Sequence, residues 1–168
     1  MSRWSACCAV LVLATSAHAD EATLRPQLQA DLGLSVVGVG YEQPIAGQLA
    51  IQAEVTIFGT YVLPWFGVGD RVAGFGGGVR ATWFARTSGR GLYVTPYVRA
   101  DRVSGDLDGM KGSGVAIAAG AFVGWSFGLT DRLDLRIGGG AQYIYVDADP
   151  LAASTPFIAL DAVLGYRM

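Results

Sequence analysis

The sequence predicts an all-β fold, an antiparallel transmembrane β-barrel of about eight strands. Three observations lead to this prediction. Of the 168 residues, 52% are hydrophobic and only 15% are charged, whereas soluble domains carry about 25% charged residues. Apolar and polar residues alternate with a period of two along most of the chain. The connections alternate between short and long, which is typical of barrels that cross a membrane.

The N-terminus has the pattern of a secretory signal peptide. Arg3 precedes an apolar stretch over residues 6–15, and residues 16–19 read SAHA, an A-x-A cleavage site before Asp20. The apolar stretch is shorter than the ~20 residues that a membrane-spanning helix needs. We therefore predict a signal peptide over residues 1–19 and one barrel domain over residues 20–168.

The predicted mature chain excludes several classes of function. Cys7, Cys8 and His18, the only cysteines and histidine, all lie in the predicted signal peptide. Removal of residues 1–19 takes away Arg3 alone among the charges, so 12 basic residues become 11 against 14 acidic ones, a net charge of −3. Disulfide and thiolate chemistry are thereby excluded, and no basic field for nucleic acid is present.

Seven strands can be identified from the alternation. In residues 92–101, for example, Leu92, Val94 and Val98 fall on one face, opposite Tyr97 and Arg99. Short connections are predicted near residues 43–47, 87–90 and 128–131, and long loops near 63–70, 102–112 and 147–154. One of the seven lies in residues 24–43, and the other six run over residues 48–62, 72–86, 92–101, 112–130, 132–146 and 158–168.

The eighth strand must come from residues 24–43, where the alternation changes face. Leu32, Leu34 and Val36 share one face, and Val37 and Val39 share the next. A β-bulge near Val36 and Val37 explains this change. A tight hairpin near residues 31–33, between two strands, explains it equally well.

Two other folds compete with the membrane barrel. Residues 112–130 carry no charge and include Gly120-x-x-x-Gly124, so they also fit a transmembrane helix. Period-two alternation persists there, however, apart from Phe122 on the small-residue face. A soluble lipid-binding barrel would place apolar residues inside, but here the polar faces carry the small residues that suit the narrow interior of an eight-stranded barrel.

Charged residues of both signs fall on the predicted inward face. Because unpaired buried charges are costly, we expect them to form a paired network, with Arg136 bound to Glu54 or Asp161. Arg132 and Arg167 on the basic side, and Asp31 on the acidic side, are further inward candidates. The predicted network comprises Glu42, Glu54, Arg80, Arg99, Asp101, Asp134, Arg136 and Asp161.

Residues 132–146, RLDLRIGGGAQYIYV, illustrate the two faces. Gly138 and Gly140 point inward and leave space in a crowded interior, while Tyr143 and Tyr145 lie on the lipid side at the expected outer aromatic girdle.

No catalytic, cofactor or metal site is predicted. The serines are scattered and have no histidine to act as a base. The glycine runs lack the lysine of a phosphate-binding loop. The acidic pairs Asp106/Asp108 and Asp147/Asp149 provide too few ligands for calcium.

These features resemble the small outer-membrane β-barrels of Gram-negative bacteria, such as the OmpA membrane domain, OmpX and OmpW. The resemblance covers residues 24–168 and includes the C-terminal sequence LGYRM at residues 164–168. Residues 40–45 (GYEQPI), Arg80 in a glycine-rich strand and residues 91–94 (GLYV) look like a poorly characterised group of such barrels. The family usually ends in an aromatic residue, whereas this chain ends in Met168, two residues after Tyr166.

The resemblance implies an integral outer-membrane protein. Its expected partners are outer-membrane lipid, lipopolysaccharide and the barrel-assembly machinery. Its expected role is structural, or interaction through the loops 63–70, 102–112 and 147–154, whose apolar residues include Trp65, Phe66, Leu107, Met110 and Leu151. The alternative is a narrow channel for small solutes or an OmpW-like conduit that interacts with lipid.

Overall fold

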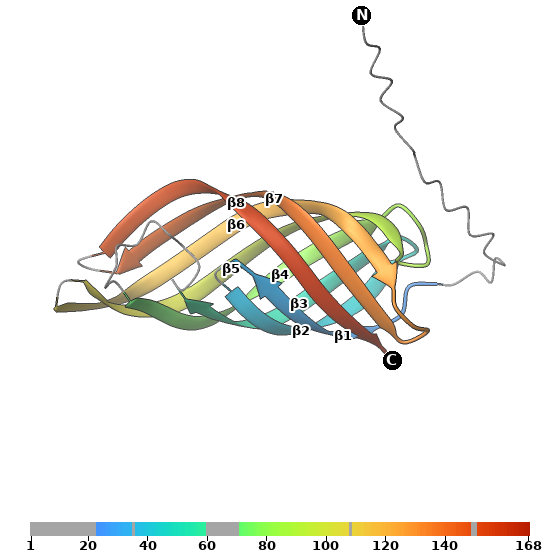
Figure 1. The fold of residues 1–168 in the computed structure, drawn as a ribbon, viewed down its shortest axis with the longest axis horizontal. Helices are drawn as coiled ribbons and strands as arrows, with labels where there is room; N and C mark the ends of the chain where they lie inside the picture. Colours follow the sequence, from blue (N-terminus) through green and yellow to red (C-terminus); the bar gives the residue numbers. More distant parts are fainter. Residues whose placement is uncertain (1–22, 35, 60–70, 108, 149–150) are drawn as a thin grey trace, which may run out of the picture.

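The computed structural model describes residues 23–34, 36–59, 71–107, 109–148 and 151–168. Each strand pairs antiparallel with the next, and the last pairs with the first to close the barrel (Figure 1). The predicted signal peptide lies outside the described residues. The strands are β1 (Gln27–Gly33), β2 (Val36–Ala46), β3 (Leu49–Gly59), β4 (Arg71–Phe84), β5 (Gly91–Leu107), β6 (Met110–Gly128), β7 (Leu133–Ala148) and β8 (Leu151–Arg167).

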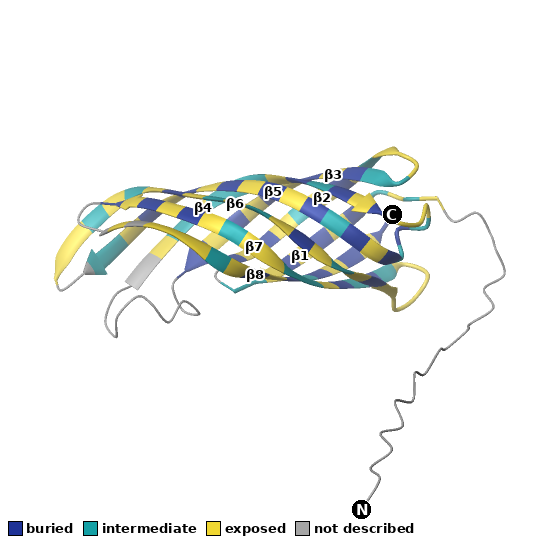
Figure 2. Cartoon of the chain, turned by 90° about the horizontal axis from the view of Figure 1, so that it is seen from above, coloured by how far each residue is buried: buried dark blue, intermediate teal, exposed yellow. Residues whose placement is uncertain are grey.

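The period-two pattern of the sequence becomes the two faces of the barrel wall. Buried and exposed residues alternate along the strands in Figure 2. Apolar side chains such as Val39 and Phe75 are exposed on the outside, by 65% and 67%. Polar side chains such as Gln52 and Thr56 are buried inside. This arrangement is the reverse of a soluble barrel, as the sequence predicted.

The N-terminal segment forms a hairpin rather than one bulged strand. β1 and β2 pair from Gln27↔Glu42 to Leu32↔Val37, and the turn between them switches the inward face from odd to even residue numbers. The hairpin supplies the eighth strand. The helix considered for residues 112–130 is wrong, because β6 pairs along its length with β5 and β7. Among the described residues no helix is long and apolar enough to span a membrane.

Two of the predicted long loops are wrong. The pairing of β5 with β6 continues from Arg102↔Val115 to Leu107↔Met110, and β7 pairs with β8 as far as Ala148↔Leu151. Gly109, in the β5–β6 turn, has a φ of 82°, a left-handed conformation that glycine adopts without strain. Serine and glycine in these segments looked like loop residues, but backbone pairing needs no apolar side chain. The loop predicted over 63–70 lies outside the described residues.

The barrel wall has unequal height. One end carries the short turns β2–β3, β4–β5 and β6–β7 together with the C-terminus, and we call it the short-turn end. At the opposite, long-hairpin end, β1 stops at Gly33, which pairs with Asp161 of β8. β8 itself begins at Leu151, so its first part extends past β1. In Figure 1, β1 ends near the middle of the long axis, whereas β5 to β8 continue toward the left end.

Candidate functional site in the barrel interior

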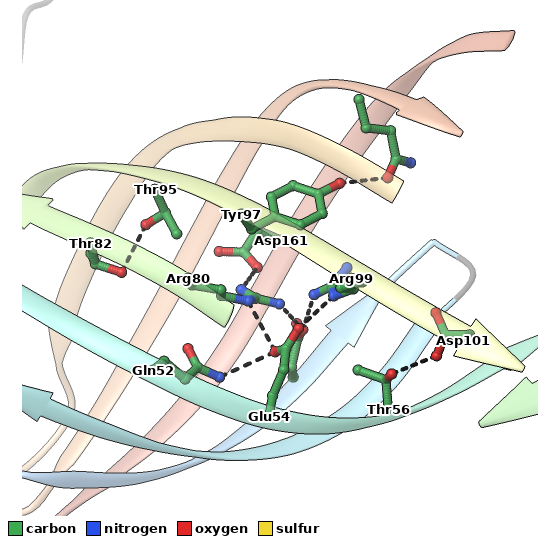
Figure 3. Close-up of polar contacts among 12 residues, drawn as sticks. Gln52, Glu54, Thr56, Arg80, Thr82, Thr95, Tyr97, Arg99, Asp101 and Asp161 are labelled. Carbon is green, nitrogen blue, oxygen red and sulfur yellow. Dashed lines mark hydrogen bonds and ion pairs between the residues drawn. The ribbon is translucent and has the colours of Figure 1, made fainter. Parts of the chain in front are cut away.

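A buried charge cluster lies at the centre of the interior. Arg80 contacts Asp31, Glu54 and Asp161, with its Nε 3.0 Å from Glu54 and its Nη1 2.7 Å from Asp161. Arg99 donates to Glu54 and to Asp31, both at 2.5 Å. The five residues come from β1, β3, β4, β5 and β8, and we call them the central cluster. Figure 3 shows Arg80 and Arg99 converging on Glu54, with Asp161 bonded to Arg80.

Two aromatic rings cover the arginines of the central cluster. Tyr97 and Phe122 stack with 4.7 Å between their centroids and 8° between their planes. The guanidinium carbon of Arg99 lies 4.7 Å from the Tyr97 centroid, and that of Arg80 lies 5.6 Å from the Phe122 centroid. These are distances of cation–π contacts. Phe122, the exception on the small-residue face of β6, therefore fills the interior beside the charges.

Arg136 pairs with Glu42 rather than with Glu54 or Asp161. Its Nη1 and Nη2 each donate to one Glu42 carboxylate oxygen at 2.7 Å, the bidentate geometry that guanidinium favours. Its Nη2 also donates to Gln27, and it lies over the Phe84 ring at 4.7 Å. The expected partners were wrong because the strand tilt decides which residues on opposite walls share a level, and alternation carries no information about tilt.

Asp134 forms a third charged group near the short-turn end. Arg167 bonds its carboxylate through Nε and through Nη2, the latter at 3.0 Å. Gln27 donates to it at 2.9 Å, and Arg90 lies 3.6 Å away. Arg167 also donates to the Ser88 carbonyl in the β4–β5 turn, so this group ties the last strand to a turn across the barrel.

Arg132 was expected inside, and that expectation is wrong. It lies in the turn before β7, where the alternation of the strand does not apply, and it is exposed. Its Nη1 donates to the hydroxyl of the outward-facing Tyr166 at 3.2 Å. This hydrogen bond raises the pKa of the Arg132 guanidinium above its usual value.

Asp101, the remaining residue of the predicted network, bonds to a neutral partner. Thr56 donates to it at 2.7 Å. A similar neutral hydrogen bond joins β5 to β7, where Gln142 accepts from the Tyr97 hydroxyl at 2.5 Å. Figure 3 shows the Thr56–Asp101 bond apart from the central cluster. The eight predicted residues thus lie inside the barrel but divide into separate groups.

Inward glycines make room for the large interior side chains. A Cβ atom on Gly138 would lie 2.5 Å from the Tyr93 hydroxyl oxygen, and one on Gly124 would lie 2.7 Å from it. That hydroxyl donates to Asp161 at 3.0 Å. Because Gly124 of β6 and Gly138 of β7 have no side chains, Tyr93 of β5 can reach Asp161 of β8.

The long-hairpin end of the interior is lined by apolar side chains, a feature that was not predicted from the sequence. Its members share the inward face and are each at most 6% exposed. The period-two pattern does place these residues inward, so the signal was present once the strands are extended past the predicted loops. We call this set the upper apolar cluster: Val36, Phe58, Val103, Ala116, Ile144, Val146 and Ala148.

No protein-family model and no curated protein sequence matches the chain. Solved structures do match. Neisserial surface protein A is 18% identical with a TM-score of 0.57, over 86% of this chain and 95% of that one. The N-terminal β-barrel domain of Pseudomonas aeruginosa OprF is 12% identical with a TM-score of 0.52, over 84% of this chain and 96% of that one. The chain therefore has the closed eight-stranded fold of small outer-membrane barrels.

Proposed function

We propose that the protein spans the outer membrane as a closed structural barrel that presents its long-hairpin end for interaction and performs no catalysis. The observation that carries the proposal is Arg80, which bridges carboxylates from β1, β3 and β8 across the interior. An eight-stranded barrel has an interior just wide enough for side chains to fill. The central cluster and its aromatic cover occupy that width.

The free energy of the buried ion pairs favours an interior that stays closed to solutes. Removal of one member of a buried ion pair leaves its partner charged and without compensation, which costs about 3–5 kcal/mol. A passing ion or small solute would have to separate Arg80 and Arg99 from Asp31 and Glu54. The interior is therefore a packed core rather than a water-filled path.

The long-hairpin end provides the surface for interaction. β5–β6 and β7–β8 continue beyond the end of β1, and Met110 at the start of β6 is 56% exposed. With the C-terminus and the short turns in the periplasm, these hairpins face the cell exterior. They are the parts of the chain suited to contact lipopolysaccharide or an extracellular partner.

Planar-bilayer recording tests the closed barrel. The purified, folded protein should produce no discrete conductance steps above the leak, whereas a general porin inserted under the same conditions should produce them. Reproducible channels that appear with the folded protein and vanish when it is heat-denatured would contradict the proposal. A lipid-hydrolysis assay tests the absence of catalysis, and turnover by the folded protein would contradict it.

A second candidate is an apolar conduit or binding site at the long-hairpin end. Two observations favour it: the upper apolar cluster lines the interior there, and the β1–β8 pairing ends at Gly33↔Asp161 while β8 continues to Leu151. An acyl chain entering between β8 and β1 would meet apolar side chains.

A dansylated fatty acid tests this second candidate. Its binding to the folded protein in detergent should contain a saturable part that Val146→Asp removes and that the outward-facing Tyr145→Phe leaves intact. Binding that never saturates, as in empty micelles, would exclude the conduit.

A further inference from the structure

The short-turn end carries more exposed positive than negative charge. Among the described residues there, Arg25, Arg86 and Arg132 are exposed and Arg90 is partly exposed, against Asp131 as the exposed acidic residue. The whole chain is nevertheless net negative, with 12 basic and 14 acidic residues. A local excess of arginine on an acidic protein favours an anionic partner at this end.

Two of these arginines lie beside aromatic side chains on the lipid-facing surface. Arg132 donates to the hydroxyl of Tyr166, which is 43% exposed. Arg86 lies in the β4–β5 turn at the same end as Trp125, which is 48% exposed. A Cβ atom on Gly91 would lie 3.8 Å from both the Arg86 Nε and the Trp125 Cζ2. Arg86 and the Trp125 ring thus both lie beside Gly91, whereas Arg132 is hydrogen-bonded to its ring directly.

The backbone fixes the position of both arginines. The carbonyl of Arg132 accepts from the Arg167 amide of β8 at 2.7 Å, and the carbonyl of Arg86 accepts from the Gly89 amide at 3.1 Å. The Arg132 amide donates to Thr130 Oγ1 at 3.2 Å. The guanidinium groups therefore extend from ordered turns.

Tryptophan and tyrosine on the outside of a barrel mark the level of the lipid headgroups. A guanidinium at that level can donate two parallel hydrogen bonds to a phosphate, while the adjacent ring packs on the glycerol and the first part of the acyl chain. Peptidoglycan carboxylates are another class of anion at this end of an outer-membrane barrel. The arginines lie on the rim beside lipid-facing rings, however, where a phospholipid reaches them directly.

We propose that Arg86 with Trp125, and Arg132 with Tyr166, form two binding sites for phospholipid phosphate. Assignment of these sites to the periplasmic leaflet rests on the proposed function. The sites themselves belong to the folded barrel in any orientation.

Native mass spectrometry of the delipidated, detergent-folded barrel tests the sites. Titration with phosphatidylglycerol should give two bound lipids that persist at higher collision energy. Arg86→Gln and Arg132→Gln should each remove one of them or weaken it by about tenfold, the effect of losing a hydrogen bond to a charged group. Tyr166→Phe should weaken only the site of Arg132.

Arg25→Gln is the matched control, because it removes an exposed arginine from the same end without an aromatic neighbour in the described contacts. Equal weakening by all three glutamine variants would overturn the proposal in favour of general electrostatic attraction. Retention of both lipids in the double variant Arg86→Gln/Arg132→Gln would overturn it as well. A muropeptide serves as the competing probe: if the unsubstituted barrel binds it and the double variant does not, while lipid binding persists, the proposal is overturned. Heat-shifted gel migration verifies the folding of each variant, and channel recording tests the proposed function separately.

Discussion

Among the described residues, Arg80 is the buried arginine that contacts the most carboxylates. It contacts Asp31, Glu54 and Asp161, and it is 3% exposed. Such a charge is tolerated in a low-dielectric interior only because its partners are equally buried. Loss of Arg80 would leave these buried carboxylates charged and without their shared cation.

Arg80→Ala should destabilise the folded barrel by about 3–5 kcal/mol, because it leaves buried carboxylates without their shared cation. Urea unfolding in lipid vesicles, followed by tryptophan fluorescence, measures the change in free energy. Arg102→Ala is the control, since Arg102 is exposed on the outward face of β5. Equal stability of the two variants would show that the buried ion pairs of Arg80 do not stabilise the fold.

Gly138 and Gly139 form a matched pair for testing the packing of Tyr93. Gly138→Ala should destabilise by about 1–3 kcal/mol, the usual effect of overpacking, because its Cβ would meet the Tyr93 hydroxyl at 2.5 Å. Gly139→Ala should be nearly neutral, since the nearest atoms lie 3.8 Å away. The same unfolding assay reports both, and a neutral Gly138→Ala would show that Tyr93 moves without cost.

At the scale of the strand, the part of β8 that extends past β1 accepts side-chain hydrogen bonds at its own backbone. Ile158 and Pro156 lie in the part of β8 that extends past β1. Gln142 donates to the Ile158 carbonyl at 3.3 Å and Thr155 to the Pro156 carbonyl at 3.2 Å. Pro156 also lacks an amide hydrogen. Side-chain donors and proline are devices that keep an exposed strand from pairing with another chain.

β6 allows a test of which face meets lipid. Val123→Arg, on the outward face within the apolar part of the strand, should destabilise the barrel by about 2–4 kcal/mol because the charge enters the hydrocarbon layer. Ser113→Arg, on the same exposed face but nearer the long-hairpin end, should cost about 1 kcal/mol or less. Unfolding in vesicles compares them. A tolerated Val123→Arg would place this strand outside the membrane.

Alternation in the sequence was enough to predict most of the strands and the face of most side chains. The direction of Arg99, Asp134 and Phe122 follows from residue parity alone. Partners do not, because the level of Glu42 relative to Arg136 depends on register and tilt, which join distant parts of the chain. The ends of β5 and β6 were missed because they contain glycine and serine, although Asp108-Gly109 is a strong hairpin signal.

The whole molecule should behave as one closed unit. The unboiled protein in detergent should migrate differently on a gel from the boiled protein, and its circular dichroism spectrum should be that of β-structure. The paired ladder from β1 to β8 and the closing β1–β8 contact are the physical reason. Identical migration with a helical spectrum would contradict the fold.

The interior ion pairs also bear on the order of assembly. Arg80 of β4 meets Asp31 of β1 and Asp161 of β8, and Arg136 of β7 meets Glu42 of β2. In a sheet that has not yet closed, these charges face lipid or water without their partners. The chain therefore gains its interior neutralisation only when its first and last strands meet, so incomplete intermediates are disfavoured inside the bilayer. If the protein inserts as proposed, completion of the barrel and entry of its charged face into the membrane are a single coupled event.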